Sequence, residues 1–193
     1  MAETPARLPQ GTPVHVLTVS DGVAGGTRDD RSGELIAARL EALGGTVTRA
    51  VVADDLVAIA EAISAAVQAH RIVVTTGGTG LTPRDVTPQA TRTILAYEVP
   101  GIAEAMRAAG RAVTPLADLS RGLAGVVGRA LVINLPGSPK AAGESLAAVE
   151  AVLAHAIETL AGPHEHDAGR VRDSGSGPGT GSRVERASAQ GPG

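Results

Sequence analysis

The chain has 193 residues, a hydrophobic content of 43%, a charged content of 19% and a formal net charge of −3, a composition typical of one globular domain. It has no cysteine, which excludes disulfides, thiolate zinc sites and thiol catalysis. A single aromatic residue, Tyr97, and the lack of a dense basic patch argue against nucleic acid as a partner.

Short β-branched runs alternate with segments whose apolar residues have helical spacing. In chain order we expect a strand over 13–19, a loop over 20–31, a helix over 32–43, a strand over 46–52, a helix over 54–69, a strand over 71–76, helices over 88–95 and 100–112, a strand over 130–135 and a long helix from 138 to about 160. The segment 116–128 fits neither pattern. The alternation predicts an α/β fold with a mostly parallel sheet covered by helices on both faces.

The composition changes near the end of the chain, where Gly, Ser, Pro, Arg and Glu dominate and periodic apolar residues vanish. We therefore expect a flexible N-terminus over 1–12, one domain over 13–161 and a disordered tail over 162–193. His164 and His166 lie in this tail, and two histidines without further ligands are expected to be solvated. The first residues lack the apolar core of a signal peptide, and no apolar run reaches about 18 residues, so we expect a cytoplasmic protein that does not span a membrane.

Three loops follow the carboxyl ends of predicted strands, over 20–31, 76–87 and 136–140. Each is rich in Gly, Ser, Thr, Asp or Pro. Because ligands of parallel α/β sheets bind beyond the carboxyl ends of the strands, these loops are expected to form one site.

The loop after the third strand carries the clearest chemical signal. Its residues Thr76, Gly77, Gly78, Thr79 and Gly80 can bring backbone N–H groups close to a phosphate. The loop matches neither the Walker A pattern nor the dinucleotide pattern. On the residues alone, a strand-to-helix turn that requires positive φ angles is an alternative interpretation.

Two carboxylates are candidates for magnesium. Asp85 follows Arg84 within Thr82-Pro-Arg-Asp, where it either braces the next helix or holds Mg²⁺ against phosphate oxygens. Arg84 either clamps a phosphate or pairs with Asp85. Asp54 and Asp55 stand at a strand-to-helix junction, where capping of the helix is the plainer interpretation.

The remaining candidates flank the other two loops. Ser20 and Asp21 end the first strand, and Ser32 and Gly33 begin a helix whose N-terminus could cradle an anion. The last loop contributes a rigid turn suited to a base edge, with a lysine in reach of phosphate, and it equally suits an ordinary helix start. Its candidates are Pro136, Gly137, Ser138 and Lys140.

Four motifs in this order resemble the molybdenum cofactor biosynthesis proteins of the MogA/MoaB type, which include the gephyrin G domain. They are Val19-Ser-Asp-Gly with Asp30-Arg-Ser-Gly, Thr75-Thr-Gly-Gly-Thr-Gly, Thr82-Pro-Arg-Asp-Val-Thr-Pro and Leu135-Pro-Gly-Ser-Pro-Lys. The resemblance covers about residues 13–161 and implies a three-layer α/β/α fold, usually a trimer.

The resemblance also implies an activity. Such proteins transfer AMP from ATP to the terminal phosphate of molybdopterin, with Mg²⁺, and release pyrophosphate. The two acidic positions held essential in the family match Asp54 and Asp85, which this assignment makes the metal-binding and catalytic pair. It also implies a later hand-over of the product to a molybdate-insertion protein.

Two alternatives stay open. The first is a module of the same fold that binds molybdopterin without turnover. The second is a nucleotide hydrolase similar to competence-damage proteins, which carry Leu where this chain has Thr79 and a second Asp where it has Arg84. Those two departures and the single-domain length disfavour the hydrolase, and the intact Asp54 and Asp85 favour the enzyme over the binding module.

Overall fold

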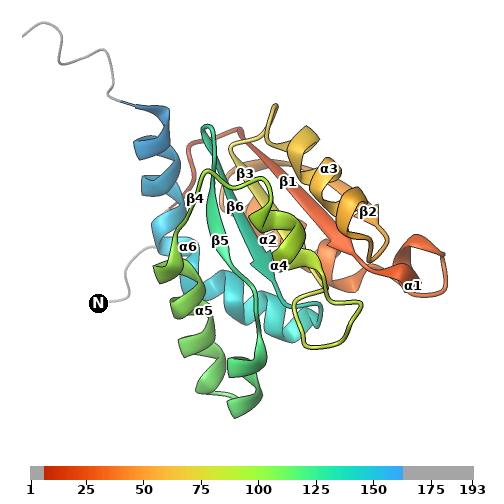
Figure 1. Cartoon of the computed structure of the whole chain (residues 1–193). Helices are drawn as coiled ribbons and strands as arrows, with labels where there is room; N and C mark the ends of the chain where they lie inside the picture. The colour runs from red at the N-terminus through yellow and green to blue at the C-terminus, as the bar shows by residue number, and fades with distance from the viewer. Residues whose placement is uncertain (1–6, 163–193) are drawn as a thin grey trace, which may run out of the picture. The chain divides into compact units, whose positions relative to one another are not determined.

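The β-branched runs of the chain pair side by side in one sheet. The structure is a computed structural model that describes residues 7–162. Its sheet has the strand order β2-β1-β3-β6-β5-β4 (Figure 1). The strands are β1 (Thr12–Val19), β2 (Gly45–Val52), β3 (Ile72–Thr76), β4 (Tyr97–Glu98), β5 (Ala124–Val127) and β6 (Ala130–Leu135). β1, β2, β3 and β6 are parallel, while β4 and β5 are antiparallel to their neighbours, so the expected mostly parallel sheet is confirmed.

Helices cover both faces of the sheet, as the alternating pattern predicted. The helices are α1 (Asp21–Ala24), α2 (Arg31–Ala42), α3 (Leu56–Ala66), α4 (Thr87–Arg92), α5 (Pro100–Arg111), the 3₁₀ helix η1 (Pro115–Leu119) and α6 (Pro139–Ala161). Apolar residues of α2, α5 and α6 pack on one face, and those of α3 and α4 pack on the other. The sole aromatic residue, Tyr97, is exposed, so both cores consist of aliphatic side chains. The three-layer α/β/α arrangement is therefore confirmed.

The order of the strands locates the place where a ligand is expected. β1 and β3 are neighbours, but the chain continues from β1 to α2 on one face and from β3 to α4 on the other face. The two connections therefore diverge and leave an opening at the carboxyl ends of these strands. Such a topological switch point is the usual ligand site of an open parallel sheet.

Four elements differ from the sequence-based expectation. The segment 20–31, predicted to be a loop, begins with the short helix α1, because the Ser20 hydroxyl accepts a hydrogen bond from the Val23 N–H and caps it. The unassigned segment 116–128 contains η1 and β5. β4 and β5 have only two and four residues, too few to show a periodic pattern.

The folded part begins before residue 13. Leu8 is buried against the core, and its N–H donates to the Leu43 carbonyl at 2.9 Å. The Gly11 N–H donates to the Gly44 carbonyl at 2.8 Å. Residues 8–12, which were expected to be flexible, are thus packed on the loop that precedes β2. The predicted tail beyond Gly162, with His164 and His166, lies outside the described residues.

A chain of hydrogen bonds joins β1, β2 and the end of α3. The Nδ1 atom of His15 lies 2.7 Å from the Thr48 hydroxyl, which lies 2.9 Å from Nε2 of His70. Nδ1 of His70 lies 2.8 Å from the Ala66 carbonyl, so it must donate there. Burial, together with the nearby His70, lowers the pKa of His15 below its ordinary value of 6.5.

This cluster predicts a pH dependence of stability. A group whose pKa is lowered on folding stabilises the protein above its unfolded pKa and loses that contribution as pH falls through the folded value. The free energy of unfolding should therefore decrease between pH 7.5 and 5.5, where carboxylates stay ionised, and His15→Gln should weaken this decrease. Urea titrations at both pH values measure the free energy of unfolding. An equal decrease between the two pH values in wild type and variant would show that His15 is not the cause.

Candidate active site

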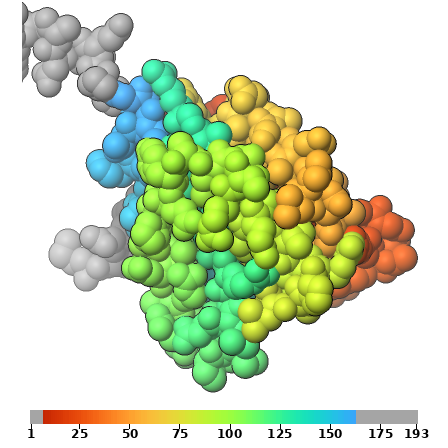
Figure 2. Space-filling view, in the orientation of Figure 1, coloured from red at the N-terminus to blue at the C-terminus, as the bar shows by residue number. Residues whose placement is uncertain are grey.

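The carboxyl ends of β1 and β3 open into a cavity of about 800 Å³. Figure 2 shows the segment after β1, in red-orange, beside the yellow-green loop after β3. Nine of the predicted residues line this cavity: Ser20, Ser32, Asp54, Thr76, Gly77, Gly78, Asp85, Gly137 and Ser138. The three predicted loops therefore meet in one place.

The glycines after β3 let three strand ends approach one another. Gly77 has φ +108° and Gly78 has φ +62°, so the requirement for positive φ is met here. A Cβ at Gly77 would collide with the Val19 carbonyl oxygen at the end of β1. A Cβ at Gly137 would lie only 3.2 Å from the Cα of Gly77, so this loop also contacts the one after β6.

Threonine hydroxyls fix the path of this loop. Thr76 donates to the Pro136 carbonyl at 2.8 Å, which ties the end of β3 to the loop after β6. Thr87, at the start of α4, donates from its hydroxyl to the Gly77 carbonyl at 2.9 Å and from its N–H to the Gly78 carbonyl at 3.1 Å. Sequence reasoning did not single out Thr87, although it lies within the Pro-Arg-Asp-Val-Thr motif.

The structure separates the roles of the two adjacent acids after β2. Asp55 caps α3, because its carboxylate accepts the Ala58 N–H at 2.9 Å. Asp54 lines the cavity, and its Oδ2 accepts the Asp21 N–H at 2.8 Å. The Asp54 N–H donates in return to Oδ1 of Asp21 at 3.0 Å. The capping interpretation therefore applies to Asp55, which leaves Asp54 oriented by the backbone of α1.

Arg84 pairs with Asp21 instead of Asp85. Its Nε donates to Oδ2 of Asp21 at 3.1 Å, and its Nη2 contacts the same oxygen. The hydrogen bond from Arg84, followed by that from the Asp54 N–H, lowers the pKa of the Asp21 carboxyl. Asp21 and Arg84 do not line either cavity; they connect the loop after β3 with the start of α1.

Asp85 is held as an anion by the loop that carries it. Burial raises the pKa of its carboxyl, but hydrogen bonds from Thr82 and from the Gly80 N–H, with the positive charge of Arg121, outweigh this effect and leave the pKa below its ordinary value. The Thr82 N–H donates to Oδ2 at 2.8 Å. Asp85 is therefore ionised at neutral pH and available to a cation or to a cationic ligand.

Two predicted residues have other contacts. The Gly33 N–H donates to the α2 cap, Oδ1 of Asp30, at 3.0 Å, so in this arrangement it is not free for an anion. Lys140 is exposed and lies 3.9 Å from Glu144 on the next turn of α6, and it does not line a cavity. Ser138 does cap α6, as its sequence position indicated, by accepting the Ala141 N–H at 3.2 Å.

A second cavity, of about 440 Å³ and with mostly apolar walls, adjoins the same loops. Thr79, Gly80 and Pro136 line it together with residues of α5, η1 and α6, and Ser138 lines both cavities. Sequence reasoning missed this cavity because most of its walls come from the unassigned segment 116–128 and from residues of α5 and α6 that resemble ordinary core positions.

Cationic side chains in the segment after α1 were also missed. Arg28 and Arg31 line the larger cavity, between Thr27 and Ser32. A Cβ at Gly22 would lie 2.7 Å from Cδ of Arg28, so this glycine lets the arginine side chain cross the backbone of α1. The cavity thus has two arginines as well as the glycine loop in its walls, and guanidinium groups suit phosphate oxygens.

The candidate metal ligands fit magnesium only in combination with a substrate. Within residues 7–162, no group of three or more His, Cys, Asp or Glu side chains is placed to hold a metal ion. Asp54 and Asp85 line the same cavity, and the glycine loop lies beside both: a Cβ at Gly78 would lie 3.3 Å from Oδ1 of Asp54, and one at Gly80 would lie 3.0 Å from Oδ2 of Asp85. Mg²⁺ commonly takes one or two carboxylates and completes its shell with substrate phosphates and water, so this donor set fits.

Comparison with known proteins decides the family. The model of the "Probable molybdopterin binding domain" family matches residues 15–156. The chain belongs to this family. A molybdopterin adenylyltransferase of Helicobacter pylori is 36% identical over 157 residues, which cover 77% of this chain and 88% of that protein. The structure of the molybdopterin biosynthesis Mog protein from Mycobacterium ulcerans matches with a TM-score of 0.74 and 37% identity, over 78% of this chain and 99% of that one.

Some relatives of this molybdopterin-binding family are much longer. A bifunctional molybdenum cofactor biosynthesis protein of Synechococcus elongatus is 44% identical over 149 residues, which cover 76% of this chain but 47% of that protein. The chain thus spans about half the length of this curated relative. Among the described helices, none is long and apolar enough to cross a membrane.

The contact at Gly77 predicts a cost for any side chain there. Gly77→Ala should lower the free energy of unfolding by at least about 2 kcal/mol, because positive φ and a collision with the Val19 carbonyl both oppose a Cβ. Gly128→Ala is the matched control, since its φ of +57° is also positive but the space around it is open, and it should cost only about 1 kcal/mol. Denaturant titrations compare the two, and equal losses would contradict the close approach.

Proposed function

We propose that this protein is a molybdopterin adenylyltransferase. It binds ATP and molybdopterin, and an oxygen of the molybdopterin terminal phosphate attacks the α-phosphorus of ATP. The new P–O bond gives adenylyl-molybdopterin, and the bond to the β-phosphate oxygen breaks and releases pyrophosphate. The observation that carries the proposal is the convergence of Asp54, Asp85 and the glycine loop on one cavity at the switch point of the sheet.

The proposed reaction needs positioning and charge neutralisation more than acid–base chemistry. A phosphate monoester is already an anion and a nucleophile at neutral pH, so no strong base is required. In the glycine loop the Gly77 N–H already donates to the Leu135 carbonyl, so we expect Gly78, together with Arg28 and Arg31, to bind phosphate oxygens of the two substrates. When bound, Mg²⁺ would supply neutralisation of the phosphate charge, and Asp54 and Asp85 are the residues that would hold it.

Two adjoining cavities suit a reaction with two substrates. The larger cavity has polar walls with arginines and carboxylates, and the smaller has mostly apolar walls. Ser138, Pro136 and the glycine loop lie between them, where the reacting phosphates of two ring-bearing substrates would meet. The product would then pass to a protein that inserts molybdate.

A pyrophosphate-release assay with ATP, molybdopterin and Mg²⁺ tests the proposal. Asp54→Asn and Asp85→Asn should each slow the reaction by about 100-fold or more, the scale on which a single electrostatic contact acts in a transition state. Asp55→Ala is the matched control: it removes a helix cap and about 1 kcal/mol of stability while the rate stays near that of the wild type. Chelation of Mg²⁺ should abolish turnover.

The same assay separates the alternatives. Tight binding of molybdopterin without pyrophosphate release would identify a binding module and contradict the proposed enzyme. Hydrolysis of ADP-ribose or of a nicotinamide nucleotide, with no adenylyl transfer, would identify the competence-damage type of activity.

We also propose that the protein assembles as a homotrimer, on the basis of its resemblance to the MogA/MoaB proteins. Light scattering at micromolar concentration should give three times the chain mass of 19.2 kDa. A monodisperse monomer under these conditions would contradict the trimer but not the activity.

A further inference from the structure

One arginine outside the four sequence motifs binds the backbone of the loop that carries Asp85. Arg121 lies between η1 and β5. Its Nε donates to the Gly80 carbonyl at 2.7 Å, and its Nη2 donates to the Asp85 carbonyl. Its own N–H donates to the Thr79 carbonyl at 2.9 Å. The guanidinium group thus bridges the first and last residues of the segment 80–85.

The centre of this segment lies on the surface. Residues 81–84 are exposed and have no helical or strand structure. The internal bonds are short-range: the Asp85 N–H donates to the Thr82 carbonyl at 3.0 Å, and the Thr82 N–H donates to the Asp85 carboxylate at 2.8 Å. Within residues 7–162, no backbone N–H donates to the Gly80 or Asp85 carbonyl. The Asp85 carboxylate also accepts the Gly80 N–H, and Arg84 ties the segment to Asp21 of α1. Arg121 acts beside these contacts, because its guanidinium group binds the carbonyls at both ends of the segment and so helps to fix the distance between them.

The bridge requires the shape of arginine and not only its charge. A guanidinium group is planar and presents several N–H donors in a fixed arrangement, so it can bind two carbonyls at once. A lysine ammonium is a single point on a flexible stem and cannot hold both carbonyls in one geometry.

Arg121 also connects the wall of the smaller cavity with the loop of Asp85. Its neighbours Ser120 and Gly122 line the smaller cavity together with Thr79 and Gly80, while Asp85 lines the larger one. The segment 120–122 therefore belongs to the wall of the smaller cavity, and Arg121 is the side chain that connects it to the Asp85 loop.

We propose that Arg121 is a positioning residue that holds the Asp85 carboxylate in place for the transfer step by clamping the carbonyls of Gly80 and Asp85. It acts through Asp85 and does not contact the substrates. The role in transfer rests on the proposed function, but the clamp itself is a property of the protein without ligands.

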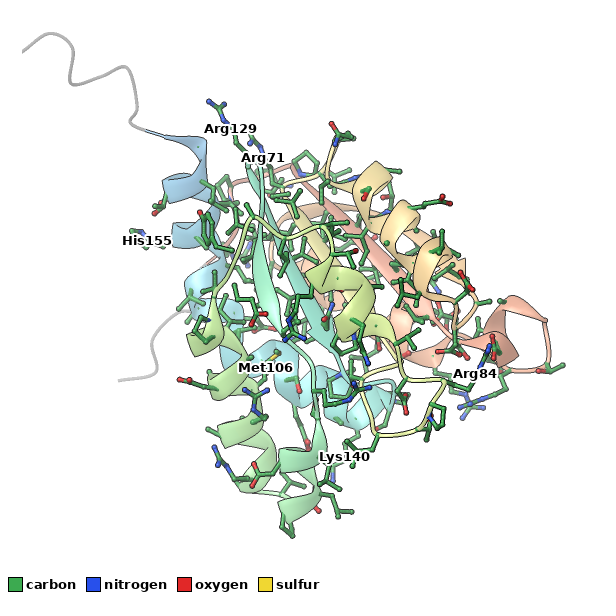
Figure 3. The ribbon with its side chains drawn as sticks, in the orientation of Figure 1. Arg71, Arg84, Met106, Arg129, Lys140 and His155 are labelled. Carbon is green, nitrogen blue, oxygen red and sulfur yellow. The ribbon has the colours of Figure 1, made fainter. Side chains whose placement is uncertain are left out.

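Arg121→Lys keeps the charge and removes the bridge. It should lower kcat by about 10–100-fold, the usual effect of losing a group that orients a metal ligand, and should leave the KM for ATP nearly unchanged. Arg129→Lys is the matched control, since Arg129 is exposed and lies at the opposite end of the sheet from Arg84 and Lys140 (Figure 3). This control should have wild-type kinetics.

Hydrogen exchange of the ligand-free protein tests the clamp without turnover. In Arg121→Lys the amides of Thr82, Asp85 and Thr87 should exchange faster, while those of β1 and β6 and the melting temperature stay as in wild type. Millimolar ethylguanidinium should restore kcat to Arg121→Ala, and ethylammonium should not, because only the former has the planar set of donors.

Wild-type kcat and wild-type exchange in Arg121→Lys would overturn the proposal. So would a loss of kcat in Arg121→Lys with unchanged exchange over 80–87, or faster exchange throughout the domain with no rescue by ethylguanidinium. An inactive wild-type protein would contradict the proposed adenylyl transfer, whereas the exchange experiment would still decide whether the clamp exists.

Discussion

Gly77 occupies the point where the backbone after β3 passes between the ends of β1 and β6. The Val19 carbonyl lies on one side of it and Gly137 on the other, and neither approach leaves room for a side chain. Because the three loops of the cavity leave these three strand ends, their spacing is fixed by backbone contacts at this residue. The hydroxyls of Thr76 and Thr87 then hold the loops at that spacing.

The charges of the cavity are arranged around fixed backbone donors. Asp54 accepts the N–H of Asp21, and Asp85 accepts N–H groups of its own loop, so each carboxylate has an orientation before any ligand binds. Asp21 joins α1, the end of β2 and the loop of Arg84 in one network. Preorganised anions beside the glycine loop and two arginines suit a reaction whose main demand is the alignment of two phosphates.

The sequence predicted the parts of this protein that repeat a pattern. β1, β3 and β6 are buried apolar runs, and α2, α5 and α6 have long apolar stripes, so the layers and the ends of the central strands followed from periodicity. β4 and β5 are held by strands distant in sequence, and α1 is held by a single cap. Each has only two to four residues, which is too short for a periodic pattern of apolar residues. The residue pattern alone did not separate the roles of Asp54 and Asp55, because both occupy a helix start. The resemblance pointed to Asp54, and the fold adds that the Asp55 carboxylate reaches the Ala58 N–H. Arg121 gave no signal, since its bonds are to carbonyls about 40 residues away, which any residue type can supply.

The exposed position of Tyr97 on β4 has a practical consequence. The chain has no tryptophan and no phenylalanine, and this tyrosine does not line either cavity. Ultraviolet absorption and emission of the protein are therefore weak and insensitive to the site. The protein adds almost no background to the optical signal of a purine or pterin ring, so a change in that signal on binding can be followed on the unlabelled wild-type chain.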